Sequence, residues 1–159
     1  MSASELEKAK ETAFKFLSYQ PRSVYEVRQK LFQKGYDSAT TEEVIERLKE
    51  LKFLDDHEFA GKLAKDLVNA KGCGIYYIAD KLKKKGIHSE TVKKVTDHLF
   101  SQIDEKEIAK ELVLKKKRSL LKDPADKGRL GRYLQSRGYG WETIQVVLQE
   151  LNDRERDKR

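Results

Sequence analysis

Apolar and polar positions repeat along this chain with a period of about 50 residues. Three leucine–glycine pairs, each separated by three residues, lie 51 and then 52 positions apart: Leu31–Gly35, Leu82–Gly86 and Leu134–Gly138. A basic residue precedes each glycine and an apolar residue follows it. A period of this length is typical of proteins built from tandem repeats. It directs the search for function toward an extended surface rather than a catalytic pocket.

Other apolar positions recur at the same interval. Three further columns align: Val27, Ile78 and Leu130; Val44, Val95 and Val147; Leu48, Leu99 and Leu151. The interval is shorter, at 49 residues, between the starts of the second and third units. This difference indicates a three-residue insertion in the third unit, which we expect within residues 119–126.

Each unit is predicted to contain three helices, because its apolar residues recur every three to four positions and no segment has the pattern of a strand. In the first unit, Pro21 ends the first helix. Ser23 with Glu26 predicts a capping box at the start of the second helix. Gly35 ends that helix, since glycine enters the left-handed conformation without steric penalty.

Polar residues predict the starts of the later helices. We expect caps from four sets: Thr40 with Glu43, Asp55 with Glu58, Ser89, and Asp104 with Glu107. Asp55 and Asp56 resemble a paired-carboxylate site, but a capping role for Asp55 explains them better because Asp104 repeats it. The segment 72–74 is predicted to break the chain between helices, and the charged residues 152–159 are expected to fray.

The expected fold is all-α, with three tandem three-helix repeats that form an elongated, curved molecule. We expect the repeats over residues 1–54, 55–103 and 104–159, the last with a charged C-terminal tail. A unit of this size has a marginal core, so neighbouring units should touch or a partner should help. No apolar run approaches the ~20 residues that span a membrane. The N-terminus does not resemble a signal peptide.

Catalytic, cofactor and metal sites are not expected. The single cysteine, Cys73, excludes a disulfide framework and fits a reducing, cytoplasmic setting. The glycines around it lack the third glycine of a dinucleotide-binding loop. His57, His88 and His98 show no ligand-like spacing. With no nucleophile–base pair and no cofactor motif, the sequence argues against an enzyme, a cofactor and a small-molecule substrate.

Positive charge is concentrated toward the C-terminus. The net charge of +7 divides into +1 for residues 1–54, +2 for 55–103 and +4 for 104–159. This asymmetry indicates a polyanion or an acidic protein surface as partner. The contact candidates are Lys81, Lys84, Lys85, Lys115, Lys116, Lys117, Arg118, Arg129 and Arg132. Cations near a helix end also favour the helix dipole, so a purely solvated role stays open for them. Leu114 could be a core residue or an exposed anchor.

Three segments resemble a known family. Residues 22–36 (RSVYEVRQKLFQKGY), 53–60 (FLDDHEFA) and 78–87 (IADKLKKKGI) are similar to motifs of the bacterial RecX regulators. The resemblance covers about residues 9–151. Two positions depart from the family pattern: Lys71 stands where an arginine is common, and Lys81 where a glutamate is usual.

The resemblance implies a function. RecX-like proteins bind the filament of the recombinase RecA on single-stranded DNA, along its helical groove. They dampen ATP hydrolysis, strand exchange and the co-protease activity behind the SOS response. The resemblance therefore implies a non-enzymatic modulator of DNA repair that binds the RecA filament and meets single-stranded DNA directly or through the filament. We expect the chain to be a monomer. The alternative is a stand-alone DNA-binding helical protein that uses its basic third repeat.

Overall fold

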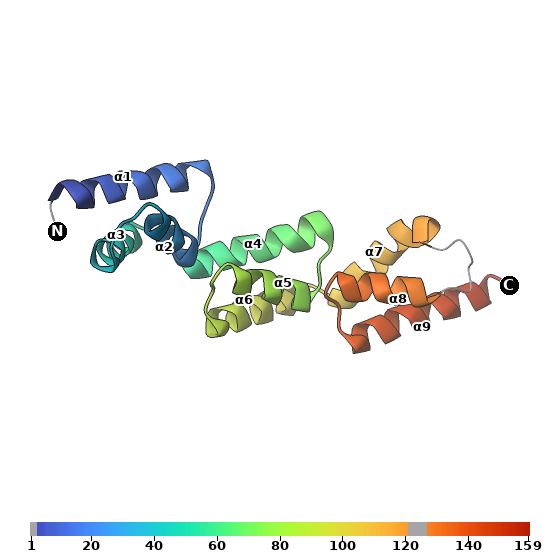
Figure 1. The fold of residues 1–159 in the computed structure, drawn as a ribbon. Coiled ribbons are helices and arrows are strands. Elements are labelled where there is room, and N and C mark those ends of the chain that lie inside the picture. The colour runs from blue at the N-terminus through green and yellow to red at the C-terminus, as the bar shows by residue number, and fades with distance from the viewer. Residues whose placement is uncertain (1–2, 121–126) are drawn as a thin grey trace. The chain divides into compact units, whose positions relative to one another are not determined.

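The computed structural model describes residues 3–120 and 127–159, and these residues form nine helices and no strand (Figure 1). The helices follow one another in three groups of three, which confirms the expected all-helical class. Their bounds are α1 Ala3–Tyr19, α2 Val24–Gln33, α3 Ser38–Glu50, α4 Asp56–Lys71, α5 Ile75–Lys84, α6 Ser89–Gln102, α7 Glu105–Leu120, α8 Lys127–Ser136 and α9 Trp141–Asp157. None of these described helices is long and apolar enough to cross a membrane.

The chain divides into two compact units. Unit 1 consists of Met1–Lys62 and Leu82–Val92, and unit 2 consists of Leu63–Lys81 and Lys93–Arg159. Unit 1 therefore holds the first helix group with the beginning of α4 and the turn after α5. Unit 2 holds the rest of α4, most of α5 and α6, and the third helix group. The middle group, α4 to α6, contributes to both units.

Unit 1 is built around the apolar stripes of α1, α2 and α3. Its core residues are Ala9, Ala13, Val24, Val27, Leu31, Val44, Ile45, Leu48 and Leu54. The buried residues of α1 are both alanines. Helix α1 packs against both α2 and α3 (Figure 1). The aligned columns predicted from the sequence thus face this core.

Unit 2 repeats the same arrangement with α7, α8 and α9. Its core residues are Ala109, Val113, Leu130, Leu134, Tyr139, Ile144, Val147 and Leu151. Leu114 lies outside this stripe and its side chain is 52% exposed. Of the two alternatives for Leu114, the structure therefore has the exposed one.

The three leucine–glycine pairs form the same helix end. The glycines have positive φ angles of 89°, 77° and 87° at Gly35, Gly86 and Gly138. In each turn the amide after the glycine donates to the leucine carbonyl: Tyr36 to Leu31 at 3.2 Å, Ile87 to Leu82 at 3.1 Å and Tyr139 to Leu134 at 3.1 Å. The glycine amides donate to the carbonyls of Phe32, Lys83 and Gln135. This pair of bonds is the Schellman motif, so the predicted helix stops are confirmed.

Of the two capping boxes predicted in the first group, one is confirmed and one is wrong. The capping box of Ser23 and Glu26 is confirmed in both directions. The capping box predicted at Thr40 is wrong, because α3 begins at Ser38 and Asp37 accepts the Thr40 amide at 2.8 Å. Thr40 instead turns into the core and is 1% exposed.

Two further predictions need correction. At the start of α6 the cap is His88 rather than Ser89, since the Glu90 amide donates to His88 Nδ1 at 3.3 Å and the Val92 amide to the His88 carbonyl. The C-terminal segment expected to fray is helical as far as Asp157, where α9 ends. The insertion expected within 119–126 falls largely on residues 121–126, which lie outside the described residues.

Candidate functional site

Within unit 1, the start of α2 is bonded to residues near the start of α4 and the end of α5. The Ser23 hydroxyl donates to the Lys85 carbonyl at 2.6 Å. The Val24 amide donates to Asp56 Oδ1 at 2.9 Å, which places a carboxylate at the positive end of the α2 dipole. Lys85 Nζ also pairs with Glu26 at 3.2 Å. We call this set of contacts the first junction.

A second junction in unit 2 uses the same positions of the next helices. The Gly74 amide donates to the Arg137 carbonyl at 2.7 Å, and the Tyr76 amide to the Gly138 carbonyl at 3.0 Å. The Ile75 amide donates to Glu105 Oε1 at 3.4 Å. In both junctions, an early amide of the second helix of a group meets a carboxylate from the first turn of the next group's first helix. Burial raises the pKa of Glu105.

The junctions account for the paired aspartates. Asp55 caps α4 by accepting the amides of His57 and Glu58 at 3.0 and 3.1 Å, as predicted, while Asp56 serves α2. Both carboxylates therefore have structural partners. In the described part of the chain, no group of three or more His, Cys, Asp or Glu side chains could hold a metal ion.

The predicted cations in α5 and just after its end, Lys81, Lys84 and Lys85, differ in what they contact. Lys85 belongs to the first junction. Lys81 Nζ lies 5.5 Å from the centre of the Tyr77 ring, within the distance of a cation–π contact. Lys84 is exposed.

The cations of α7 also differ in whether they form ion pairs. Lys117 pairs with Glu155 of α9 at 2.6 Å, and this bond lowers the pKa of Glu155. Lys127, from the start of α8, joins the same carboxylate at 3.5 Å, so the C-terminal part of α9 is bonded to both α7 and α8. Lys115 and Lys116 are exposed and have no ion-pair partner among the described residues. The side chain of Arg118 lies outside the described part of the structure.

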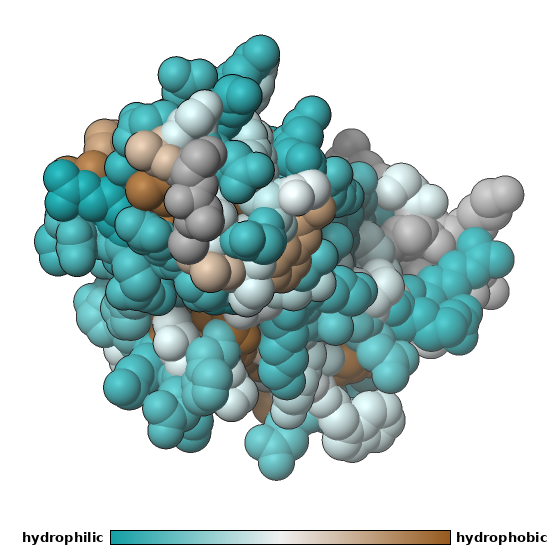
Figure 2. Space-filling view, turned by 60° about the vertical axis from the view of Figure 1, so that its left-hand side comes forward, coloured by the Kyte–Doolittle hydropathy of each residue, from teal (hydrophilic) through white to brown (hydrophobic). Residues whose placement is uncertain are grey.

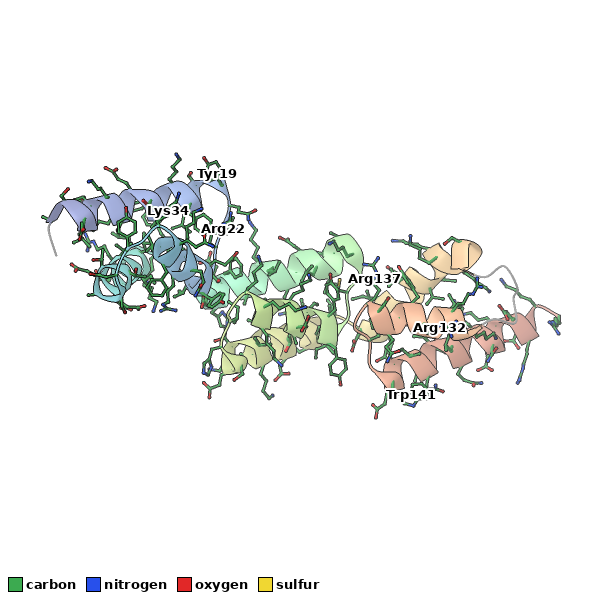
Figure 3. The ribbon with its side chains drawn as sticks, in the orientation of Figure 1. Tyr19, Arg22, Lys34, Arg132, Arg137 and Trp141 are labelled. Atoms are coloured by element: carbon green, nitrogen blue, oxygen red, sulfur yellow. The ribbon has the colours of Figure 1, made fainter. Side chains whose placement is uncertain are left out.

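Two arginines of α8, Arg129 and Arg132, are both exposed. Arg132 borders a cavity of about 370 Å³ between α8 and α9, which we call the Trp141 cavity. The lining residues are Lys127, Gly128, Gly131, Arg132, Gln135, Tyr139, Trp141, Ile144, Gln145 and Leu148. Figure 3 shows Arg132 on α8 and Trp141 at the start of α9.

The comparisons with known proteins agree on one family. A family model for the first three-helix domain of RecX matches residues 9–48, and one for the third three-helix domain matches residues 104–148. Regulatory protein RecX of Clostridium tetani is 35% identical over 148 residues, which cover 91% of this chain and 67% of that protein. The protein of the same name from Prosthecochloris aestuarii is 30% identical, with 95% and 98% covered. This chain belongs to the RecX family.

Solved RecX structures share the fold. The crystal structure of RecX from Lactobacillus salivarius matches with a TM-score of 0.84 at 24% identity, covering 95% of this chain and 99% of that chain. A crystal structure of another regulatory protein RecX matches with a TM-score of 0.80 at 22% identity, covering 92% and 73%. The resemblance read from the three sequence segments is thus confirmed. The relatives are named as regulators, in agreement with the expectation that the chain is not an enzyme.

Sequence reasoning missed the aromatic part of the Trp141 cavity. Trp141 is 74% exposed and is the only tryptophan of this RecX family chain. Its position just before the apolar stripe of α9 does not by itself separate a buried from an exposed ring. Tyr76 is 67% exposed and lies against Gly140, the residue before Trp141, since a Cβ atom on Gly140 would lie 3.1 Å from its ring.

Cys73 and Tyr139 are structural residues of unit 2. The Cys73 thiol is fully buried, and burial raises its pKa despite the opposing effect of Arg137. The Tyr139 hydroxyl donates to the Gly72 carbonyl at 2.6 Å, and burial raises its pKa well above the usual value. This hydrogen bond anchors the turn between α8 and α9 and so holds the wall of the Trp141 cavity in place.

Proposed function

We propose that this chain binds filaments of the recombinase RecA on single-stranded DNA and reduces their ATP hydrolysis, strand exchange and co-protease activity. The observation that carries the proposal is the family assignment, which includes matches to the first and third RecX domains and relatives aligned over about nine-tenths of the chain. The chain would act by binding, because no cofactor or catalytic motif is evident in the sequence.

The surface supports a binding role of this kind. Contacts of the two junctions use backbone groups and partly buried side chains, and the exposed Arg132 takes no part in them. The face seen in Figure 2 is covered mainly by hydrophilic side chains, with small and separate hydrophobic areas. A charged surface of this kind suits a partner made of protein and nucleic acid.

The test of this proposal is the ATPase activity of RecA on single-stranded DNA, measured with increasing amounts of the chain at several salt concentrations. We expect hydrolysis to fall as the chain is added. Strand exchange and co-protease activity, followed under the same conditions, should fall in parallel. Unchanged hydrolysis at micromolar protein, across all the salt concentrations, would contradict the proposal.

A second candidate function is direct binding of DNA without RecA. It is favoured by Lys115, Lys116 and Arg132, which are exposed and have no ion-pair partner among the described residues. Such cations release counterions when they meet phosphates, so the affinity should fall steeply with salt. A variant that loses DNA binding but still inhibits RecA would favour the first function, and parallel loss of both activities would favour a shared DNA contact.

A further inference from the structure

We propose that the Trp141 cavity is a base-stacking site for single-stranded nucleic acid. The Trp141 ring would hold one base, and Arg132 would meet the adjoining phosphate. The inference rests on the second candidate function, direct contact with a single strand, and gives that contact a defined place. The proposal follows from four features of the site: the exposed ring, the shape of the cavity, its polar rim and its charge.

The indole of Trp141 is exposed although its backbone is firmly placed. It begins α9 directly after Gly140, while its neighbour Tyr139 is buried and bonded to the Gly72 carbonyl. A pre-positioned aromatic face is what a stacked base requires, and it accepts any base because every base has a π-face.

The cavity is open because α8 has a glycine where a side chain would fill it. A Cβ atom on Gly131 would lie 3.6 Å from Leu148 Cδ1 and 3.8 Å from Ile144 Cγ2, so a larger side chain would occupy the space. Tyr139, Ile144 and Leu148 give the cavity an apolar lining. Such a lining suits the flat and weakly solvated faces of a base.

The polar part of the lining matches a nucleotide better than an apolar peptide side chain. Gln135 and Gln145 each carry amide donors and a carbonyl acceptor, the two kinds of group that base edges require. Arg132 is exposed, and no carboxylate of the described residues pairs with it. A guanidinium beside an aromatic ring is the usual combination in sequence-tolerant single-strand sites.

The chain contains one tryptophan, so its tryptophan fluorescence reports on the cavity directly. The chain should be titrated with an oligothymidylate of about 16 nucleotides, the upper end of common site sizes, and with an abasic strand of equal length. Both strands carry the same phosphates, but only the first has bases. We expect quenching by the oligothymidylate and about ten-fold weaker binding, without quenching, of the abasic strand.

Variants separate stacking from general charge. By fluorescence anisotropy of a labelled strand, Trp141→Ala should weaken binding about ten-fold. Tyr19→Ala should leave binding unchanged, because Tyr19 is 73% exposed on α1 and lies in unit 1. Gly131→Ala should keep the fold, since its added methyl group makes only ordinary contacts, and should reduce the quenching by narrowing the cavity.

The outcomes distinguish this site from DNA binding in general. Equal binding of both strands without quenching, with Trp141→Ala binding like the wild type, would overturn the base-stacking site but leave DNA binding standing. No binding of either strand would overturn both. Quenching by RecA in the absence of DNA, with none by the oligothymidylate, would identify a protein occupant and overturn the proposal.

Discussion

Tyr25, near the start of α2, packs against Gly86 so closely that a Cβ atom on Gly86 would lie 2.2 Å from the Tyr25 Cβ. Tyr77 stands in the same relation to Gly138, where a Cβ atom would lie 2.2 Å from the Tyr77 amide nitrogen. Gly35 has the same positive φ but no such neighbour within 4 Å. The glycine therefore ends a helix in all three groups and also permits a close junction in two of them.

Replacement of Gly86 by alanine should be more harmful than the same change at Gly35. Gly35→Ala should lower the free energy of unfolding by about 1–2 kcal/mol, from the left-handed conformation alone. Gly86→Ala should lower it by a further ~1–3 kcal/mol, because the methyl group overlaps Tyr25. Urea-induced unfolding followed by circular dichroism measures both. Equal losses in the two variants would show that the first junction does not depend on this approach.

The helices could be predicted from sequence because their signals are local. Apolar residues at helical spacing, Pro21 and the glycine stops act within a few residues of themselves. The junctions could not, because Ser23 and Lys85 lie 62 residues apart and Val24 and Asp56 lie 32 apart. No local pattern tells which carboxylate will reach which helix end. The wrong cap at Thr40 has a related cause. Asp37 and Thr40 could each cap α3, and Thr40 is buried in the folded chain while Asp37 forms the cap.

The candidate site was predicted only in part for the same reason. The charge pattern found the cations but not their partners, so Lys85 and Lys117 proved to be bonded to residues 59 and 38 positions away. Exposure of an aromatic ring is likewise a property of the folded chain. Trp141 would have been assigned to either a core or a surface on sequence alone.

Lys52 offers a stabilising change. It ends α3 with a φ angle of 64°, in a turn where the Phe53 amide donates to the Leu48 carbonyl at 2.9 Å, like the turns that contain glycine. Lys52→Gly should raise the free energy of unfolding by about 1 kcal/mol, because glycine adopts this conformation without strain. Lys49→Gly, inside α3, should lower it by a similar amount, about 1 kcal/mol. A loss of stability in Lys52→Gly would contradict the expectation.

Glu105 should make stability depend on pH. Because burial raises its pKa in the folded chain, the native state holds a proton that the unfolded state releases, and ionisation costs stability as the pH rises through this range. Glu105→Gln keeps an acceptor for the Ile75 amide but carries no charge. The variant should be more stable than the wild type at neutral pH, and this gain should vanish as the pH falls below the ordinary carboxyl value of 4.5.

The pH profile of unfolding, measured from about pH 4 to pH 8 around that ordinary carboxyl range, tests this expectation. Glu111→Gln is the matched control, because it removes the same charge from an exposed position of α7. It should follow the wild-type profile. A stability difference for Glu105→Gln that is constant over the whole range would show that burial of the carboxylate is not its cause.

The paired and unpaired cations of α7 should differ in DNA binding. Lys115→Ala with Lys116→Ala removes two exposed charges and should reduce the slope of log affinity against log salt by about 1.4, at ~0.7 per phosphate contact on a single strand. Lys117 is left in place, because its bond to Glu155 ties α7 to α9. The control is Lys8→Ala with Lys15→Ala, which removes two exposed charges from α1. If both double variants lower the slope equally, the strand responds to net charge and not to α7; an unchanged slope in both would place the DNA contact elsewhere.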